Sequence, residues 1–381
     1  MLITADVSAQ RPKVCSVQWH IAGILPAAKE QKQSLGFAGP IAGIHQDVLM
    51  VAGGANFPDS MPWLGGKKKY YDDVFVFTLR KKASVAFYKS CKLPFPIAYS
   101  ASCSTPEGII SVGGENGSGI GNKALLLQWN KTAENIRIIN LPDLPFFITN
   151  AAITAIDDKV YVAGGEMKDD VSKNFLVLDL KDTKTGWQQL PSLPKPISHA
   201  VMVAQSNGKL QCIYVLGGRK SNRGSTSDLY ASLFQFDLKT NKWSEKKDLP
   251  YALSAGTGIA AGEHSILLFG GDKGETFHKT EELIAAINKE TDTARKEILN
   301  QQKIKLQSSH PGFSKQVLLY NTVKDEWTVI GSIPFDVPVT TTAVKWRDKV
   351  MIPGGEIKAG VRTPQILAGE IYFCEANRSK K

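Results

Sequence analysis

The sequence predicts an all-β protein, a six-bladed β-propeller, and two observations support this fold class. Six Gly-Gly pairs each end a short apolar run, and the runs are rich in the β-branched and aromatic residues that favour strands. The pairs are Gly53-Gly54, Gly113-Gly114, Gly164-Gly165, Gly217-Gly218, Gly270-Gly271 and Gly354-Gly355. Two glycines tolerate positive φ and leave no side chain where blades crowd, so the backbone can turn toward the next strand.

The spacing of the pairs is close to the roughly 50-residue period of kelch repeats, which predicts a kelch propeller. Each repeat consists of an inner strand of small residues, the run that ends in Gly-Gly, a third strand, and an outer strand that often contains Trp. In blade three these elements are 149–156, 159–165, 175–180 and the segment that begins at Trp187.

The two ends of the repeat array predict how the ring closes. After Gly354-Gly355 one further strand follows, at 366–373, and no outer strand comes after it. The segment 14–25 carries Trp19 and precedes Pro26, as the outer strands of other blades do. We therefore expect the N-terminal strand to complete blade six, which leaves no unpaired seam in the ring.

The interval between the last two pairs is longer than the others and predicts a helical insertion in blade five. Its apolar residues roughly follow helical spacing, and they are Leu283, Ile284, Ile287, Ala294, Ile298 and Leu299. We place the insertion at about 275–312, between the second and third strands, as a binding-site wall or as mere decoration. The whole propeller is predicted as one domain over 14–376, with flexible termini at 1–13 and 377–381.

Composition excludes several classes of protein. Hydrophobic content of 43% and charged content of 22% are typical of a globular domain. The net charge of +10 is compatible with a small anionic ligand, but the basic clusters fall at predicted loops or strand ends, which argues against nucleic acid. No apolar stretch is long enough to span a membrane, and a homodimer is compatible with the sequence.

The five cysteines and the first ten residues bear on the compartment. Cys15, Cys91, Cys103, Cys212 and Cys374 are odd in number and contain no C-x-x-C pair, so we expect neither a disulfide framework nor a zinc site, but small buried apolar residues. The segment 7–9 resembles the end of a trimmed signal peptide, which predicts a periplasmic protein. A polar N-terminus of a cytoplasmic protein would look similar.

Polar side chains gather on one face of the predicted ring, where the loop after each second strand meets the loop before each first strand. The loops after the Gly-Gly pairs bring Asn56, Glu115, Glu166, Arg219, Asp272 and Glu356. The other loops bring Phe37, Tyr99, Asn150, His199 and 340–342. This chemistry predicts a pocket for a polar small molecule. Alternatively, acids such as Glu115, Glu166 and Asp272 accept backbone N–H bonds in their turns, and His199 is structural.

The loop that begins at Glu356 is the most informative of the six. Lys358 and Arg362 follow the acid on a loop that contains Gly360. A guanidinium can hold an anionic ligand while a carboxylate transfers a proton. The segment from Gly355 to Thr363 reads G-E-x-K-x-G-x-R-T and resembles the motif of the kelch-type sialic acid mutarotases, also called N-acetylneuraminate epimerases.

The resemblance covers nearly all six blades, and it indicates the cyclically permuted bacterial branch of this family. It implies that the chain interconverts the α and β anomers of N-acetylneuraminate without a cofactor or metal. It also implies that Glu356 is the proton acceptor and Arg362 the arginine of the same loop. Where unpermuted members carry an Arg-Asp pair, this chain has Ser198-His199, so Arg219 or Arg223 is expected to hold the sugar carboxylate.

The general acid stays open between Tyr99, His199 and a water molecule. The main alternative function is a non-catalytic kelch module that binds a protein or glycan on the same face. A sialidase is disfavoured because no repeated S-x-D-x-G-x-x-W pattern occurs. A copper oxidase would need a closer Tyr, His and Cys constellation.

Overall fold

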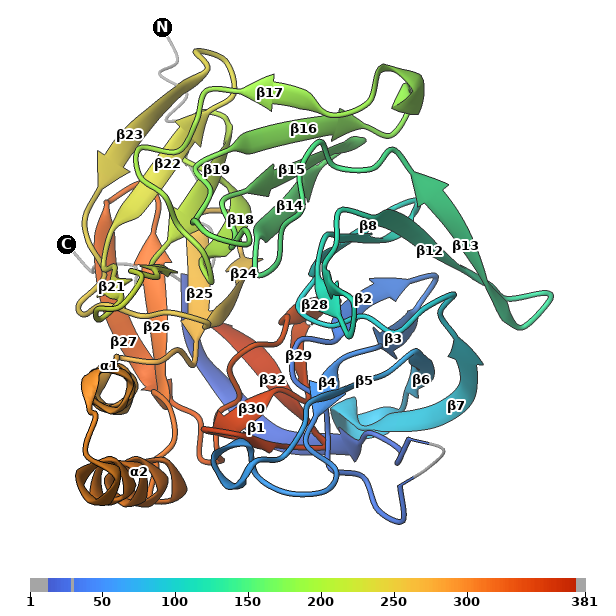
Figure 1. The fold of residues 1–381 in the computed structure, drawn as a ribbon. Helices are drawn as coiled ribbons and strands as arrows, with labels where there is room; N and C mark the ends of the chain where they lie inside the picture. The colour runs from blue at the N-terminus through green and yellow to red at the C-terminus, as the bar shows by residue number, and fades with distance from the viewer. Residues whose placement is uncertain (1–12, 29–30, 375–381) are drawn as a thin grey trace, which may run out of the picture.

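Six four-stranded antiparallel sheets are arranged as blades around a central channel in the computed structural model, which describes residues 13–28 and 31–374 (Figure 1). This arrangement confirms the predicted all-β, six-bladed propeller. From the channel outwards, blade one consists of β2 (Ile41–His45), β3 (Val48–Ala52), β6 (Asp73–Leu79) and β7 (Val85–Lys92). Blade two consists of β8 (Ala101–Thr105), β9 (Gly108–Val112), β12 (Ala124–Asn130) and β13 (Asn135–Leu141). Blade three consists of β14 (Ala152–Ile156), β15 (Lys159–Ala163), β16 (Phe175–Asp179) and β17 (Gln188–Leu190).

The other three blades follow the same order, except that the last strand of blade six comes from the start of the chain. Blade four consists of β18 (Val201–Ser206), β19 (Gln211–Leu216), β22 (Leu233–Asp237) and β23 (Lys242–Lys246). Blade five consists of β24 (Thr257–Ala261), β25 (Ser265–Phe269), β26 (Gln316–Asn321) and β27 (Glu326–Ser332). Blade six consists of β28 (Val344–Trp346), β29 (Lys349–Pro353), β32 (Gln365–Cys374) and β1 (Lys13–Ile24). The strand β1 pairs antiparallel with β32, so closure by the N-terminal strand is confirmed.

In the described part of the chain, the loops also contain four two-stranded antiparallel ribbons and three short 3-10 helices. The ribbons directly follow the Gly-Gly pairs of blades one, two, four and six, and they are β4 (Ala55–Asn56) with β5 (Lys69–Tyr70), β10 (Glu115–Asn116) with β11 (Gly119–Ile120), β20 (Arg219–Lys220) with β21 (Asp228–Leu229), and β30 (Glu356–Lys358) with β31 (Val361–Arg362). The 3-10 helices are η1 (Pro62–Leu64), η2 (Lys81–Ala83) and η3 (Thr183–Thr185).

The core lies between neighbouring blades. Every residue of β3 and of β9 is buried, because each of these strands is covered on both faces by adjacent blades. Between blades two and three, for example, Val112 and Leu126 pack with Val160 and Leu176. Each such side chain stabilises the fold by roughly 1.5–3 kcal/mol on full burial. Apolar runs without polar alternation are therefore what this fold requires of its second strands.

The Gly-Gly pairs join each blade to the next one. Gly53 and Gly54 have φ of 64° and 91°, and the Gly54 N–H donates to the carbonyl of Ile97 in the following blade at 2.8 Å. A Cβ at Gly53 would lie 2.3 Å from that same carbonyl oxygen. The pair thus permits both the left-handed turn and the close approach of two backbones. This is why the sequence signal recurs once per blade.

A closed ring of six backbone hydrogen bonds surrounds the channel. One residue per blade takes part, and its N–H donates to the carbonyl of its counterpart in the preceding blade at 2.7–3.1 Å. The six are Gly39, Tyr99, Asn150, His199, Ala255 and Thr340, and their φ values lie between 52° and 64°. The ring fixes the backbone positions from which Tyr99, Asn150 and His199 extend.

Two helices interrupt blade five between its second and third strands, as predicted. They are α1 (Glu275–Lys289) and α2 (Thr293–Ser308), which pack side by side at the edge of the ring (Figure 1). The Asp292 side chain accepts a hydrogen bond from the Arg295 N–H at 2.7 Å and caps the second helix. Neither helix in the described part of the chain is long and apolar enough to cross a membrane.

The expectation that no cysteine is disulfide-bonded is wrong. A disulfide joins Cys15 on β1 to Cys374 on β32, so it fastens the two strands that close the ring. Cys212 is buried as expected, whereas Cys91 and Cys103 are only partly buried. The predicted flexible termini fall outside the described residues, apart from Lys13, which begins β1.

Candidate active site

Each blade places the residue that directly follows its Gly-Gly pair on one face of the ring. An antiparallel bridge holds this residue against the loop before the first strand of the same blade. The six equivalent positions are Ala55, Glu115, Glu166, Arg219, Asp272 and Glu356. Because these positions are related by the repeat, their side chains converge above the channel, as the sequence indicated.

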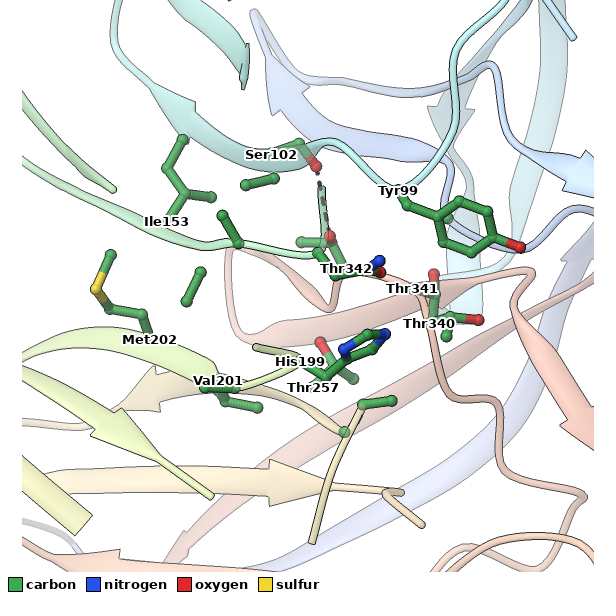
Figure 2. A pocket seen from close by; sticks show the side chains of 18 of the residues that line it. Tyr99, Ser102, Ile153, His199, Val201, Met202, Thr257, Thr340, Thr341 and Thr342 are labelled. Carbon is green, nitrogen blue, oxygen red and sulfur yellow. Dashed lines mark hydrogen bonds between the residues drawn. The ribbon is translucent and has the colours of Figure 1, made fainter. Parts of the chain in front are cut away.

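A cavity of about 490 Å³ lies on this face, within the range of roughly 300–1,000 Å³ that is typical of small-molecule sites. Nine of the residues predicted for this face line it, and they are Tyr99, Glu115, Asn150, Glu166, His199, Arg219, Asp272, Glu356 and Arg362. Below the cavity a smaller space of about 130 Å³ occupies the channel, lined by small side chains such as Ser102 and Thr257. Figure 2 shows this channel, with Tyr99 at the right and Met202 and Ile153 at the left.

Asn56 is the predicted site residue that the structure does not bring to the cavity. The equivalent position in blade one is Ala55, and a step of one residue along a strand turns the side chain to the other side. Asn56 is 1% exposed, and its side chain donates to the Gly36 carbonyl at 2.9 Å and accepts from the Tyr71 hydroxyl at 2.8 Å. Its amide therefore holds the inside of blade one together.

Phe37 and residues 340–342 of the predicted face also lie away from the cavity. Phe37 is fully buried in the core of blade one, where its ring packs against Tyr71. Thr341 and Thr342 line the channel below. Arg223, one of two arginines expected to hold a carboxylate, has a side chain that is 88% exposed and pairs with Asp169. Arg219 is the arginine of blade four that reaches the cavity.

Glu356 and Arg362 face each other across the ribbon of β30 and β31. Their side chains are paired in register, and Arg362 Nη2 lies 3.0 Å from Glu356 Oε2. The other oxygen of Glu356 accepts from the Gly360 N–H at 3.1 Å. Gly360 has a φ of 70°, and a Cβ there would lie 2.9 Å from Pro62 and Trp63. The glycine of the motif is therefore required by both the turn and a close contact with η1.

Arg362 is held in place while part of its hydrogen-bonding capacity is unused. Its guanidinium lies 4.7 Å from the ring centroid of Phe57, within cation–π distance, and Nη2 lies 3.5 Å from the Tyr99 hydroxyl. Its side chain is 5% exposed, yet Nε and Nη1 have no partner among the described residues. Buried donors of this kind are costly unless a ligand satisfies them, so the geometry suits an anionic group in the cavity.

Burial raises the pKa of Glu356 above the usual value for a glutamate. The Arg362 guanidinium, the Gly360 N–H and Lys68 oppose this shift, whereas Asp272 adds to it. A carboxyl whose pKa lies closer to neutrality is a better match for proton transfer than an ordinary glutamate. Glu356 thus combines a cavity position with the electrostatics of a general base.

On the side of blades three and four, Glu166, His199 and Arg219 form a second cluster. Arg219 Nη2 lies 3.3 Å from Glu166 and 3.4 Å from Nε2 of His199, whose Nδ1 lies 3.1 Å from the Ser198 hydroxyl. A guanidinium only donates, so Nε2 of His199 accepts and the ring proton sits on Nδ1. Burial, reinforced by Arg219, lowers the pKa of His199 to about 3. His199 is therefore neutral.

Burial acts against the charged form of Glu166 in the same cluster. His199, whose Nδ1 proton faces Glu166, the Arg219 guanidinium and the Ser198 hydroxyl together outweigh burial, so the pKa of Glu166 lies below its usual value. The two glutamates that border the cavity on opposite blades thus differ, because Glu356 has a raised pKa and Glu166 a lowered one. Such a separation makes Glu356 the better suited of the two to proton transfer and Glu166 the better suited to a fixed negative charge.

Lys68 is a cavity residue that sequence reasoning missed, and so is the contact that Tyr70 makes with the cavity residue Glu115. Lys68 Nζ lies 3.0 Å from Glu115 and 4.8 Å from the ring centroid of Tyr99, and the Tyr70 hydroxyl donates to Glu115 at 2.7 Å. Burial opposes the charge of Lys68, but Tyr99 and Glu115 outweigh it and raise its pKa. In the sequence Lys68 stands in a basic run that looks like a solvated loop, so no local signal could have found it.

The helical insertion forms one wall of the cavity, which is one of the two roles that the sequence left open. Its contribution comes from α1, from the end of α2 and from the segment after α2, and the residues are Thr276, Phe277, Thr280, Glu281, Ile284, Gln307, His310 and Phe313. Asp272 lies just before α1, and its carboxylate accepts from the Gly274 N–H at 2.8 Å. Asp272 therefore accepts a backbone N–H bond in its turn, which was the alternative role that the sequence offered, and it also borders the cavity.

Comparison with known proteins adds independent information. A family model described as N-acetylneuraminate epimerase matches residues 141–378, a region that contains Glu166, Arg219, Glu356 and Arg362. Similar curated proteins called N-acetylneuraminate epimerase occur in Vibrio vulnificus (26% identical over 230 residues), Brucella melitensis biotype 1 (25% over 227) and Yersinia enterocolitica serotype O:8 (27% over 239). The matches cover 59–61% of this chain and only 57–58% of these relatives' own length.

Proposed function

This chain belongs to the N-acetylneuraminate epimerase family, and we propose that it is an isomerase that interconverts the α and β anomers of N-acetylneuraminate. The observation that carries the proposal is the pair formed by Glu356 and Arg362. It joins a carboxyl of raised pKa to a guanidinium with two unpartnered nitrogens, at the wall of one cavity. An anionic sugar acid supplies both a carboxylate for the cation and a hydroxyl proton for the base.

The reaction needs two proton transfers. Glu356 removes the proton from the anomeric hydroxyl, the bond between the anomeric carbon and the ring oxygen breaks, and the ring oxygen takes up a proton. The resulting open-chain ketone rotates, and the hydroxyl closes on the other face of the carbonyl with the protons moving in reverse. Positioned proton transfer of this kind accelerates a reaction on the order of 10²–10⁴-fold.

Tyr99 is the better candidate for the proton donor. His199 is neutral, and its Nε2 accepts from Arg219. Its ring proton, on Nδ1, faces Ser198 and Glu166, so it is not directed toward the sugar as a donor. The Tyr99 hydroxyl, in contrast, lies beside the Arg362 guanidinium, and the Lys68 ammonium lies over its ring. Its O–H group therefore lies at the cavity wall, next to the guanidinium that would bind the sugar carboxylate.

The test is NMR measurement of anomer exchange on N-acetylneuraminate with wild-type protein, Glu356→Gln and the control Glu326→Gln. Glu326 is an exposed acid on the outer strand β27, so its amide variant has the same chemical change without the cavity. We expect wild type and the control to accelerate exchange equally and Glu356→Gln to lose about 10²–10⁴ of that acceleration. Full acceleration by folded Glu356→Gln removes Glu356 from the mechanism.

A non-catalytic glycan-binding module is the alternative function. It would use the same cavity and the same guanidinium, so binding alone does not distinguish it from an epimerase. It predicts that wild-type protein binds the sugar acid and leaves the rate of anomer exchange at the uncatalysed value. The same NMR series therefore decides between the two functions.

We also propose that the protein works in an oxidising compartment such as the periplasm. The disulfide between Cys15 and Cys374 supports this placement, because disulfides persist in oxidising compartments and are rare in the cytosol. Fractionation of cells that express the natural gene, followed by thiol labelling under denaturing conditions, tests it. A cytoplasmic protein with all five thiols reactive would contradict the proposal.

A further inference from the structure

The inserted helix α1 is fastened to blade four at one point. The Glu281 carboxylate accepts from the backbone N–H of Ser227 at 2.8 Å and from its hydroxyl at 2.6 Å. One turn earlier, His278 Nε2 lies 2.9 Å from the Ser227 carbonyl. Because all three contacts meet at Ser227, just before β21, the helix has a fixed position relative to the ribbon of β20 and β21 that carries Arg219.

This attachment sets an aromatic ring against the arginine of the second cluster. The Arg219 guanidinium carbon lies 4.6 Å from the ring centroid of Phe277, which is within the distance of a cation–π contact. On its other sides the same guanidinium meets Glu166 at 3.3 Å and His199 at 3.4 Å. Arg219 is 19% exposed, and its Nε has no partner among the described residues.

The arrangement repeats that of the candidate catalytic pair. Arg362 pairs with Glu356 and stacks on Phe57, while Arg219 pairs with Glu166 and stacks on Phe277. The two pairs belong to opposite parts of the ring, since blade three lies across the channel from blade six and blade four from blade one (Figure 1). Phe57 comes from the propeller itself, but Phe277 comes from the insertion.

We infer that Phe277 is a positioning residue: it holds Arg219 in the orientation that binds polar oxygens of the sugar acid, on the side of the cavity opposite Glu356. The inference rests on the proposed function and assigns a task to the insertion. A flat ring restricts the guanidinium to one plane, and Glu166 with neutral His199 sets its direction within that plane. Less side-chain freedom is then lost when the ligand binds.

This role predicts an effect on substrate binding rather than on the chemical step. Glu356, which transfers the proton in the proposed reaction, lies in blade six, where its carboxylate is held by Arg362 and the Gly360 N–H rather than by Phe277. Loss of the aromatic face from Arg219 should therefore raise KM on the order of 3- to 20-fold, the range that a cation–π contact supports, and leave kcat within about twofold. A merely structural role would lower the folded fraction and leave KM unchanged.

The experiment compares Phe277→Leu, Phe277→Tyr and the control Phe147→Leu in anomer exchange and in calorimetric binding of N-acetylneuraminate. Phe147 is 59% exposed and outside the cavity, so its variant makes the same change elsewhere. We expect KM and Kd to rise for Phe277→Leu only, and Phe277→Tyr to match wild type because it keeps the ring. An unchanged KM, a fall in kcat alone, or no rescue by tyrosine overturns the inference.

A double-mutant cycle with Arg219→Gln tests whether Phe277 acts through Arg219. We expect Phe277→Leu to add nothing to KM in the Arg219→Gln background, whereas an additive effect overturns the inference. Should Phe277→Leu not fold, Glu281→Gln releases α1 from Ser227 and must raise KM in its place. If wild-type protein binds the sugar acid without accelerating anomer exchange, the proposed function is refuted, and the Kd values of the Phe277 variants then decide the role of Phe277. If wild-type protein does not bind the sugar acid, both the proposed function and the inference are refuted.

Discussion

Arg362 lies 3.0 Å from Glu356 and yet does not bring the pKa of that carboxyl down to its usual value. Burial of Glu356 is the stronger influence, and Asp272 acts in the same direction. The guanidinium therefore limits the rise in the pKa of Glu356 that burial causes. It can serve at the same time as a binding group, since two of its nitrogens have no partner among the described residues.

This relationship predicts the direction of a shift in the pH profile. A base acts only when deprotonated, so kcat/KM should fall as pH drops through the raised pKa of Glu356. Arg362→Gln removes the neighbouring cation, which raises that pKa further and moves the acid limb to higher pH. Anomer exchange measured by NMR from pH 4 to pH 8 gives the profile. Arg137→Gln, on the outer strand β13, is the control, and a limb that stays in place or moves to lower pH contradicts the account.

Much of the fold follows from local requirements that leave a mark in the sequence. Gly53 and Gly54 must have positive φ and must admit a neighbouring backbone at van der Waals distance, which only glycine satisfies without strain. Because this requirement is repeated in every blade, the number of blades can be predicted from the number of Gly-Gly pairs in the sequence. The closing strand was readable as well, because β1 keeps the Trp19 that packs against Phe269.

The site was less readable wherever it depends on register or on long-range pairing. Asn56 was placed one residue beyond the equivalent position, Ala55, since a repeat does not show which neighbour faces the cavity. Lys68 and Tyr70 reach Glu115 only because β5 returns to pair with β4 after a long loop. The disulfide depends on a contact between residues 359 positions apart, for which spacing gives no signal.

Asn56 should matter for stability and not for the reaction. Asn56→Ala removes the hydrogen bonds to the Gly36 carbonyl and from the Tyr71 hydroxyl inside blade one, which should cost roughly 1–3 kcal/mol of unfolding free energy. Urea unfolding measures that loss, and Asn140→Ala, an exposed change on β13, is the control. The KM of the folded Asn56→Ala protein should match wild type. A KM change with unaltered stability would instead return Asn56 to the binding site.

His199 should stay neutral throughout the range in which an ordinary histidine titrates. Its pKa of about 3 results from burial and from the Arg219 guanidinium, so the ring carries no charge between about pH 5 and pH 8. Nitrogen–proton correlation NMR of the imidazole should show a single Nδ1-H tautomer over this range. A His199 signal that titrates near pH 6.5 would contradict the cluster described above.

Reduction of the disulfide should weaken the closure of the ring without altering the site. The bond joins β1 to β32, and without it the N-terminal strand is held only by its pairing and by packing such as that of Trp19. A disulfide typically contributes about 2–4 kcal/mol to stability, so dithiothreitol should lower the melting temperature of wild-type protein. Cys15→Ser and Cys374→Ser should each have the melting temperature of the reduced wild-type protein, and neither variant should respond to reductant. The double variant should have the same melting temperature as each single variant. Cys91→Ser, which changes a free thiol, should keep the full response. Equal melting temperatures with and without reductant would mean that β1 is held by pairing and packing alone.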